Sequence, residues 1–195
     1  KQEASVAAQL QHPHTVKIFD YGATESGALF LVMELLQGHT FKSEFKKGPI
    51  DPLRLLLIMR QICGALGEAH EKRIIHRDIK PENLLIQDGI IKVTDFGLSR
   101  STLQHSVASP ELMKDGVGTP AYMAPELFRG GAYSERIDVY AMGICFYEVV
   151  SREWAFSGME DEDIADTVLH EDGRPELPEW CPAQLQELIK SCWAQ

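Results

Sequence analysis

The chain has 195 residues, of which 44% are hydrophobic and 25% charged, and this length suits one domain with a substantial core rather than two. A net charge of −10 repels nucleic-acid phosphates and anionic membrane surfaces, so we expect neither as a partner. The four cysteines show no C-x-x-C spacing, and there is neither a signal peptide nor an apolar run of about 18 residues, so we expect no membrane span and a reduced, cytoplasmic (intracellular) location.

The first 50 residues predict a helix, a β-hairpin and a connector. Residues 2–11 are rich in Ala and indicate the end of a helix that Pro13 closes. Residues 15–21 and 29–35 are β-branched or apolar runs separated by glycines, which is typical of a hairpin. The periodicity is then lost over residues 35–38, as in a connector between two lobes.

A long amphipathic helix and a tight hairpin follow. Residues 52–72 carry apolar side chains at helical spacing, with Asp51 as the N-cap and Pro52 at the first position. Residues 84–87 and 90–94 flank Asp88-Gly89, a pair that tolerates the positive φ angles of a type I′ turn. This hairpin is expected to place Asn83 and Asp95 beside each other at its outer ends.

The second half of the chain is predicted to be mainly helical. A long segment of low periodicity, rich in Ser, Thr and Gly, runs from Asp95 to residues 124–126, and such a loop in a compact domain is usually functional. Residues 137–150 carry only two charges, which indicates a helix buried nearly all round. Acidic residues 160–166 are interpreted as a solvated stretch before a short helix. Residues 184–193 predict a last helix with one apolar face, formed by Leu185, Leu188, Ile189 and Cys192.

Three polar side chains provide the chemistry of phosphoryl transfer. Asp78 can accept the proton of an attacking hydroxyl, while Asn83 and Asp95 offer the hard oxygen ligands that Mg²⁺ prefers. Asp78 and Asn83 fit the pattern H-R-D-x-x-x-x-N, Asp95 opens D-F-G, and residues 124–126 read A-P-E. With these motifs the chain resembles the protein kinase family from its first residue to its last.

The resemblance implies an α+β, bilobal kinase-like fold with ATP and Mg²⁺ as cofactors. Residues 1–34 would be a truncated N-lobe of a helix and a hairpin, 35–38 the hinge, and 39–195 a mainly helical C-lobe without its final helix. Met33 would line the back of the nucleotide pocket, Glu34 and Leu36 would offer backbone groups to adenine, and Leu85 would also contact the nucleotide. For Met33, ordinary packing at a strand end is an equal alternative.

The resemblance also implies structural roles for five residues. Asp138 would anchor the backbone of the catalytic loop, although a charge that favours a helix N-terminus is a compatible reading. Glu3 occupies the position of the αC glutamate, and a solvated helix charge is its alternative. Glu126 would pair with an arginine on a further helix, and His76 and Phe96 complete their motifs.

Two family elements, the glycine-rich phosphate loop and the phosphate-gripping lysine, would lie before Lys1, so we expect the chain as given to be inactive although its parent is an active enzyme. A pseudokinase scaffold is the alternative, and a missing upstream lysine would favour it. Small-molecule phosphotransferases of the aminoglycoside type share H-x-D-x-x-x-x-N, but they lack D-F-G followed by A-P-E.

The resemblance further predicts the substrate class. Lys80, two residues after Asp78, and Thr119 in G-T-P-A-Y are typical of serine/threonine kinases, whose substrates are protein Ser or Thr hydroxyls. Glu82 and Glu148 match two acidic positions that hold basic residues upstream of the acceptor. Exposed glutamates without that role are an open alternative.

Regulation is expected to involve the loop after D-F-G. Arg77 and Arg100 match residues that pair with a phosphate on the activation segment, and the usual phosphate-bearing position falls on Asp115. One carboxylate orders such a loop less completely than a phosphate, so we expect basal ordering by Asp115 and an additional phosphorylation site at Ser106 or Ser109. The alternative is that Asp115 lies in a solvated loop.

Overall fold

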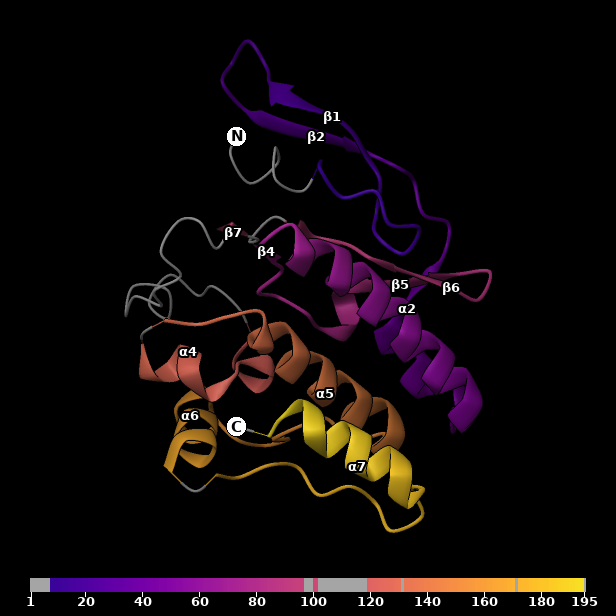
Figure 1. Ribbon diagram of the computed structural model, residues 1–195, viewed down its shortest axis with the longest axis vertical. Coiled ribbons are helices and arrows are strands. Elements are labelled where there is room, and N and C mark those ends of the chain that lie inside the picture. Colours follow the sequence, from indigo (N-terminus) through magenta and orange to yellow (C-terminus); the bar gives the residue numbers. More distant parts are fainter. Residues whose placement is uncertain (1–7, 97–99, 102–118, 131, 171, 195) are drawn as a thin grey trace.

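The computed structural model describes residues 8–96, 100–101, 119–130, 132–170 and 172–194. A β-hairpin lies at one end of the molecule, and helices pack together at the other, as Figure 1 shows. Between them a small sheet runs alongside the longest helix. The expected α+β class is confirmed.

The hairpin at the first end consists of β1 (Ile18–Ala23) and β2 (Leu29–Met33), which pair antiparallel. Gly27, with φ 85°, supplies a left-handed residue in the turn between them. The sequence predicted this hairpin, but its first strand starts later than expected. Thr15 instead forms a parallel bridge with Val93 and ties the approach to the hairpin to the central sheet.

The central sheet has the order β3-β5-β6, formed by β3 (His39–Thr40), β5 (Leu84–Gln87) and β6 (Ile90–Val93). Asp88 and Gly89 join the last two strands with φ angles of 53° and 79°, so the expected two-residue turn with positive φ angles is confirmed. The register pairs Leu84 with Val93.

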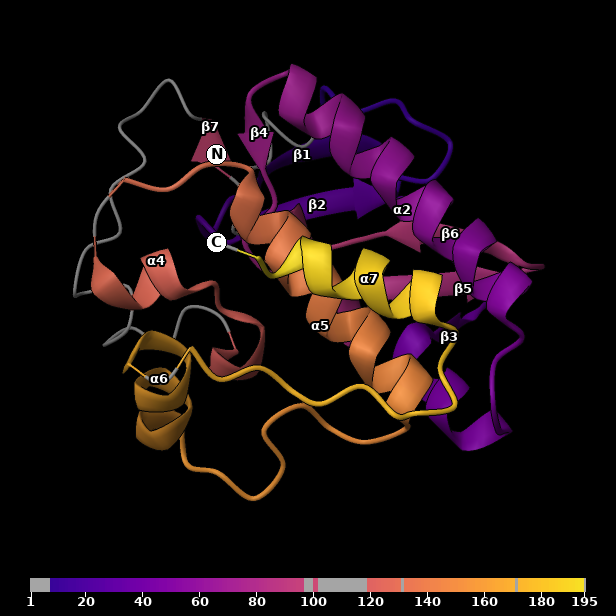
Figure 2. The same cartoon turned by 60° about the horizontal axis from the view of Figure 1, so that its bottom comes forward.

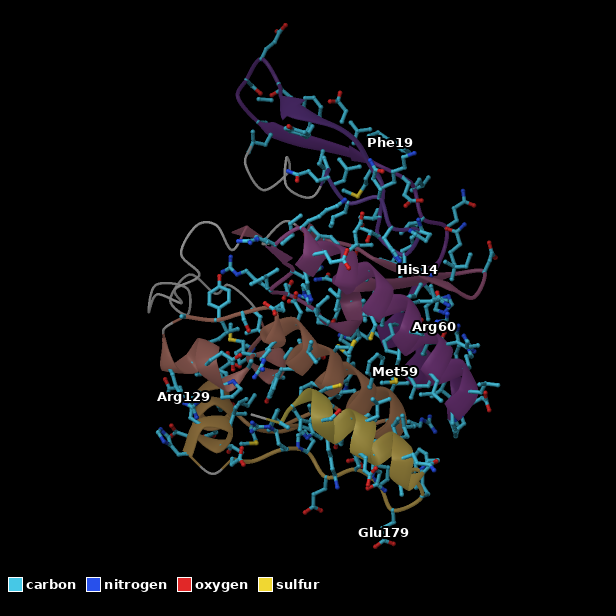
Figure 3. All side chains as sticks on the ribbon, viewed as in Figure 1. His14, Phe19, Met59, Arg60, Arg129 and Glu179 are labelled. Atoms are coloured by element: carbon cyan, nitrogen blue, oxygen red, sulfur yellow. The ribbon has the colours of Figure 1, made fainter. Side chains whose placement is uncertain are left out.

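The long helix α2 (Pro52–Glu71) lies against this sheet. Asp51 caps it, because the Asp51 side chain accepts a hydrogen bond from the backbone N–H of Arg54 at 2.9 Å. Figure 3 labels two neighbours on α2 that face different surroundings: Met59 is buried, whereas Arg60 is exposed. The predicted N-cap and helix are confirmed.

The helix α5 (Arg136–Ser151) forms the centre of the core, and its residues 140–150 are all buried. The last helix, α7 (Ala183–Cys192), lies beside it in both views (Figures 1 and 2). Gly143 allows the close approach, since a Cβ there would lie 2.7 Å from the Cβ of Cys192. Of the residues expected on the apolar face of α7, Leu185 and Ile189 are buried, whereas Leu188 is 41% exposed.

Short elements make up the rest of the described secondary structure. They are the 3₁₀ turns η1 (Phe41–Lys47), η2 (Pro81–Asn83) and η4 (Pro120–Tyr122), the paired strands β4 (Ile74–Ile75) and β7 (Arg100–Ser101), and the helices α4 (Pro125–Arg129) and α6 (Asp161–His170).

Two expectations near these elements need correction. The acidic residues 160–166 do not precede a helix but form most of its first half, where negative charge is favourable near an N-terminus. Of the helix expected over residues 2–11, Ala8 and Gln9 form a turn and the next two residues are not helical. The earlier part of that segment lies outside the described residues.

Candidate active site

The site is built on the segment between β4 and η2, which begins at His76. The imidazole of His76 is fully buried and donates from Nε2 to the carbonyl oxygen of Thr94 at 2.8 Å, while Nδ1 accepts a hydrogen bond from the backbone N–H of Asp78 at 3.2 Å. These contacts require the tautomer with its proton on Nε2. Phe96 packs against the ring, with centroids 4.5 Å apart. His76 therefore links the two ends of the site.

Asp138, at the start of α5, holds the backbone of this segment. Its carboxylate is 1% exposed and accepts hydrogen bonds from the N–H groups of His76 at 2.9 Å and Arg77 at 2.8 Å. His70, near the end of α2, donates to the same carboxylate at 2.8 Å. A buried carboxylate needs such partners, and here they join α2, α5 and the loop at one point.

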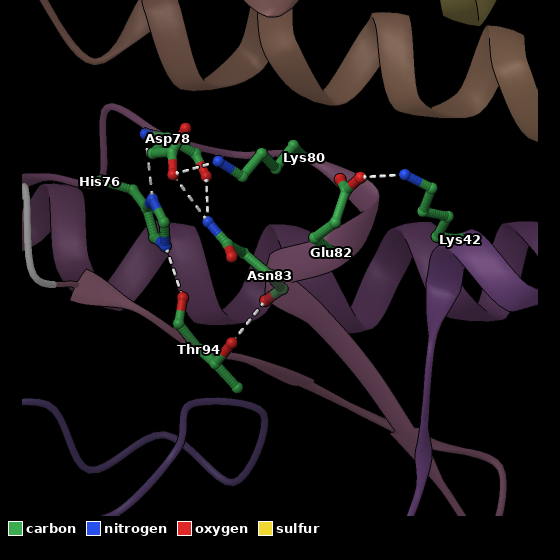
Figure 4. A network of polar contacts seen from close by, with 7 residues as sticks. All are labelled: Lys42, His76, Asp78, Lys80, Glu82, Asn83 and Thr94. Atoms are coloured by element: carbon green, nitrogen blue, oxygen red, sulfur yellow. Dashed lines mark hydrogen bonds and ion pairs between the residues drawn. The ribbon is translucent and has the colours of Figure 1, made fainter. Parts of the chain in front are cut away.

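Asp78 lies at the centre of a compact polar group (Figure 4). Its Oδ2 accepts a hydrogen bond from the amide of Asn83 at 2.9 Å and forms an ion pair with Lys80 at 2.8 Å. The Asn83 amide also donates to the backbone oxygen of Asp78 at 2.8 Å. No described residue binds the other carboxylate oxygen, Oδ1. Asp78 is thus oriented through one oxygen and has the second available.

The β5–β6 hairpin brings Asn83 close to Asp95. Beyond the Leu84–Val93 pair, the backbone N–H of Thr94 donates to the carbonyl oxygen of Asn83 at 2.9 Å, so that Asp95 follows directly after a residue paired with Asn83. Asp95 is exposed and has φ 59°, an uncommon left-handed conformation for a residue with a side chain. The amide oxygen of Asn83 has no partner among the described residues. One amide oxygen and one exposed carboxylate therefore remain for an external ligand.

The connector between β2 and β3 lies close against β5. The N–H of Gln37 donates to the side-chain oxygen of Gln87 at 3.0 Å, and His39 pairs with Ile86. Gly38 passes so near to β5 that a Cβ at this position would clash with the carbonyl oxygen of Ile86. Only glycine fits there without a shift of the backbone.

Comparison with known proteins identifies the family of this chain. The chain matches the protein kinase domain over residues 1–195. It is 37% identical over 194 residues to the serine/threonine-protein kinase PrkC of Bacillus subtilis, an alignment that covers 96% of this chain and 28% of that protein. It is also 34% identical over 197 residues to the serine/threonine-protein kinase PknL of Mycobacterium tuberculosis, covering 99% of this chain and 48% of that protein.

The chain belongs to the protein kinase domain family. It has the kinase-like α+β fold, with a small N-terminal part and a mainly helical larger part. This chain spans between about a quarter and a half of the length of these relatives. Among the residues that the structure describes, no helix is both long and apolar enough to cross a membrane.

The nucleotide-contact residues predicted for the kinase domain lie around the connector. Met33 ends β2 and is 45% exposed, Leu36 is half-buried, and Leu85 is half-buried on β5, one residue from the pair that joins the connector to the sheet. Glu34 is held in place, since its carboxylate forms an ion pair with Lys92 at 2.7 Å and accepts a hydrogen bond from the N–H of Lys17 at 2.7 Å. Burial acts to raise the pKa of Glu34, but the hydrogen bonds from Lys92 and Lys17 outweigh it and lower the pKa.

Of the two glutamates predicted to hold substrate arginines, only Glu82 reaches the surface. Glu148 is 1% exposed, its Oε2 accepts a hydrogen bond from the hydroxyl of Tyr122 at 2.8 Å, and its Oε1 accepts one from the N–H of Ala155 at 3.1 Å. Burial raises the pKa of Glu148 to about 7, although the two hydrogen bonds act to lower it. The expectation that Glu148 touches a substrate directly is therefore corrected: this residue instead ties η4 to the end of α5.

The remaining predicted positions divide into those that lie near Asp78 and those that lie elsewhere. Thr119 and Arg77 line one small cavity together with Asp78, and Arg77 also lies over the ring of Tyr133, 5.7 Å from its centroid. Glu126, in the first turn of α4, lines a separate cavity of about 450 Å³ that reaches Trp193. Glu3, Asp115, Ser106, Ser109 and the side chain of Arg100 lie outside the described residues.

Several residues at the site had no sequence signal of their own. Lys42 binds Glu82 from η1, forty positions earlier, and Trp154 lies over the same ammonium group. Lys92 holds Glu34, and Tyr122 holds Glu148. Each pair joins distant segments, so only the folded chain shows which charge meets which partner.

Proposed function

We propose that the protein to which this chain belongs transfers the γ-phosphoryl group of ATP to Ser or Thr hydroxyls of protein substrates. The names of PrkC and PknL support the acceptor class. Lys80 and Thr119 are the two residues typical of that class. Lys80 forms an ion pair with Asp78, and Thr119 lines the same small cavity as Asp78.

The observation that carries the proposal is the state of the Asp78 carboxylate. Lys80 and Asn83 bind one oxygen and fix the orientation of the group, while no described residue binds the other. The second oxygen can accept the hydroxyl proton of the substrate as the substrate oxygen bonds to the γ-phosphorus and the bond from that phosphorus to the β,γ-bridging oxygen breaks. ADP then leaves, and Lys80 stands beside the reacting carboxylate.

Asn83 and Asp95 fit a Mg²⁺ ion bound together with a nucleotide. The unpartnered amide oxygen of Asn83 and the exposed carboxylate of Asp95 are hard oxygen donors, and Mg²⁺ is commonly held by one or two protein groups plus substrate phosphates. No group of three or more His, Cys, Asp or Glu side chains suited to a metal occurs among the described residues. When bound, the ion would neutralise charge on the phosphates.

The connector would hold the adenine. The N–H of Glu34 is occupied by the carbonyl oxygen of Lys17 at 2.9 Å, so Glu34 would offer its own carbonyl oxygen, and Leu36 would offer backbone groups further along. Met33 and Leu85 would supply apolar contacts. Under this proposal residues 1–34 belong to the N-lobe, 35–38 form the hinge and 39–195 belong to the C-lobe.

The test is to replace Asp78 in the full-length protein. Asp78→Asn should keep the fold but lower phosphate transfer to Ser and Thr peptides by about 10²- to 10⁴-fold, as expected for loss of a positioned proton acceptor. The matched control is Asp166→Asn, which alters an exposed side chain on α6 and should leave phosphate transfer unchanged. Turnover of Asp78→Asn within a few fold of wild type would contradict the proposal.

A further inference from the structure

Lys42 of this chain already forms an ion pair with Glu82, the glutamate of the site that reaches the surface. The ammonium group of Lys42, on η1, lies 2.6 Å from Oε1 of Glu82 and 4.8 Å from the ring centroid of Trp154. The three residues come from η1, from η2 and from the loop after α5. Figure 4 shows Lys42 approaching Glu82 from the side opposite Asp78 and Lys80. A carboxylate and an aromatic face thus both contact one positive charge.

These surroundings suit a guanidinium group better than the ammonium group they hold. Lys42 binds one oxygen of Glu82, whereas the second oxygen, Oε2, is buried and has no hydrogen-bond partner among the described residues. An arginine that takes the place of Lys42 can donate to Oε1 while its planar guanidinium group stacks on the indole ring, a contact that arginine makes more often than lysine does.

The ion pair is also readily exchangeable. The side chains of Lys42 and Glu82 are 47% and 39% exposed, and a pair of such exposure contributes little to stability. Glu82 lies between Lys80 and Asn83 in the sequence, and both of those residues bind the carboxylate proposed to receive the substrate proton. A charged residue of the same substrate, close to its hydroxyl, is therefore the group that can reach Glu82.

We propose that Lys42 is a specificity-determining residue: it occupies, as an internal competitor, the place where Glu82 and Trp154 bind an arginine upstream of the phosphorylated Ser or Thr. The proposal rests on the proposed kinase function and adds to it the residue that limits the selection of basic substrates. Removal of the Lys42 charge should sharpen the preference for arginine, whereas loss of Glu82 should abolish it.

The experiment uses the full-length protein with Mg²⁺ and ATP. Wild type, Lys42→Met and Lys47→Met are assayed on a set of Ser peptides in which one Arg replaces Ala at each of the five positions before the acceptor. Lys42→Met keeps the apolar stem without the charge. Lys47→Met is the matched control, because Lys47 lies on the same 3₁₀ segment but pairs with Glu44 at 2.7 Å.

At one or two positions, Lys42→Met should raise the ratio of kcat/KM for the Arg peptide to that for the Ala peptide by about two- to fivefold, mainly through a lower KM. The all-Ala peptide and the Lys47→Met enzyme should stay within twofold of wild type. In the Glu82→Gln background the effect of Lys42→Met should disappear.

An active enzyme whose ratios are the same in wild type and Lys42→Met would overturn the inference for Lys42 alone. A lower ratio in Lys42→Met would also overturn it, since Lys42 would then support Glu82 rather than compete for it. Absence of any phosphate transfer by the wild-type protein, including to itself, would instead overturn the proposed function.

Discussion

The carboxylate of Asp138 holds Arg77 in a left-handed backbone conformation. Arg77 has φ 74°, and its N–H donates to Oδ1 of Asp138 at 2.8 Å. A residue with a side chain adopts this conformation at a cost of about 1–3 kcal/mol, so it persists only where surrounding contacts fix it. The same strained turn directs Asp78 toward Lys80 and Asn83, so the precision of the site depends on a carboxylate that touches none of these three side chains.

Replacement of Asp138 should therefore affect stability and activity together. Asp138→Asn exchanges an acceptor for a donor facing two backbone N–H groups, and the free energy of unfolding should fall by about 1–3 kcal/mol. Urea denaturation of the purified chain measures this change, and peptide phosphorylation by the full-length protein should fall as well. Asp161→Asn, on the exposed start of α6, serves as the control. Equal stability of Asp138→Asn and wild type would show that Asp138 does not hold the loop.

The close approach of the connector to β5 gives a second prediction. Gly38→Ala should lower the free energy of unfolding by about 1–3 kcal/mol, because the added methyl group must displace the carbonyl of Ile86. The matched substitution is Gly67→Ala on α2, where an added methyl group meets no atom within 4 Å. That change should stabilise the chain by about 0.5–1 kcal/mol, since alanine favours a helix. If Gly38→Ala leaves the midpoint of urea denaturation unchanged or raises it, the steric argument at Gly38 fails.

Glu148 predicts a pH dependence of stability. Its pKa is about 7 in the folded chain against 4.5 as the ordinary value, so between these pH values the folded state retains a proton that the unfolded state has lost. Stability therefore falls as pH rises from about 4.5 to about 7, by at most about 3 kcal/mol, and this loss is complete above pH 7. Glu148→Gln cannot ionise and should flatten the curve over this range.

The measurement is urea denaturation at several pH values between 5 and 8. The exposed Glu179→Gln should retain the wild-type curve, because that side chain lies in solvent. Parallel curves for wild type and Glu148→Gln would mean that Glu148 ionises normally inside the protein.

Asp95 gives a prediction for the metal. In the full-length protein, Asp95→Asn should raise the Mg²⁺ concentration for half-maximal phosphate transfer by about tenfold or more, because a charged oxygen ligand becomes neutral. Asp88→Asn, in the turn of the same hairpin, makes the same chemical change away from the proposed metal ligands and tolerates its φ of 53°. An unchanged Mg²⁺ requirement in Asp95→Asn would remove this residue from the metal site.

Local chemistry explains which parts of the fold the sequence predicted. Asp51-Pro52 starts α2 and Asp88-Gly89 turns the β5–β6 hairpin, because capping and positive φ angles depend on the residues themselves. The apolar run at 137–150 likewise indicated a buried helix. By contrast, Leu188 fits the helical period of α7 but remains exposed, since periodicity does not say how wide a buried face is.

The candidate site was likewise predictable from the sequence only where its contacts are local. The proximity of Asn83 and Asp95 could be predicted because the hairpin that joins them is local, and Asp78 lies only five residues before Asn83. The burial of Glu148 was not, since it depends on Tyr122 from η4 and Ala155 from a loop beyond the end of α5. Nor could the sequence indicate that Lys42 neutralises Glu82, because charge pairs between distant segments follow from packing.

The two-residue turn at Asp88-Gly89 also limits how the chain can change in length. β6 ends at Val93, which pairs with Leu84, so one residue added within β6 would shift this register and move Asp95 and Phe96 relative to Asn83 and His76. Extension of the hairpin at its turn by one residue on each strand leaves the Leu84–Val93 pair unchanged. The tip of the hairpin can therefore lengthen by pairs of residues during evolution. A single residue inserted within one strand would instead move the Asp95 carboxylate away from the Asn83 amide.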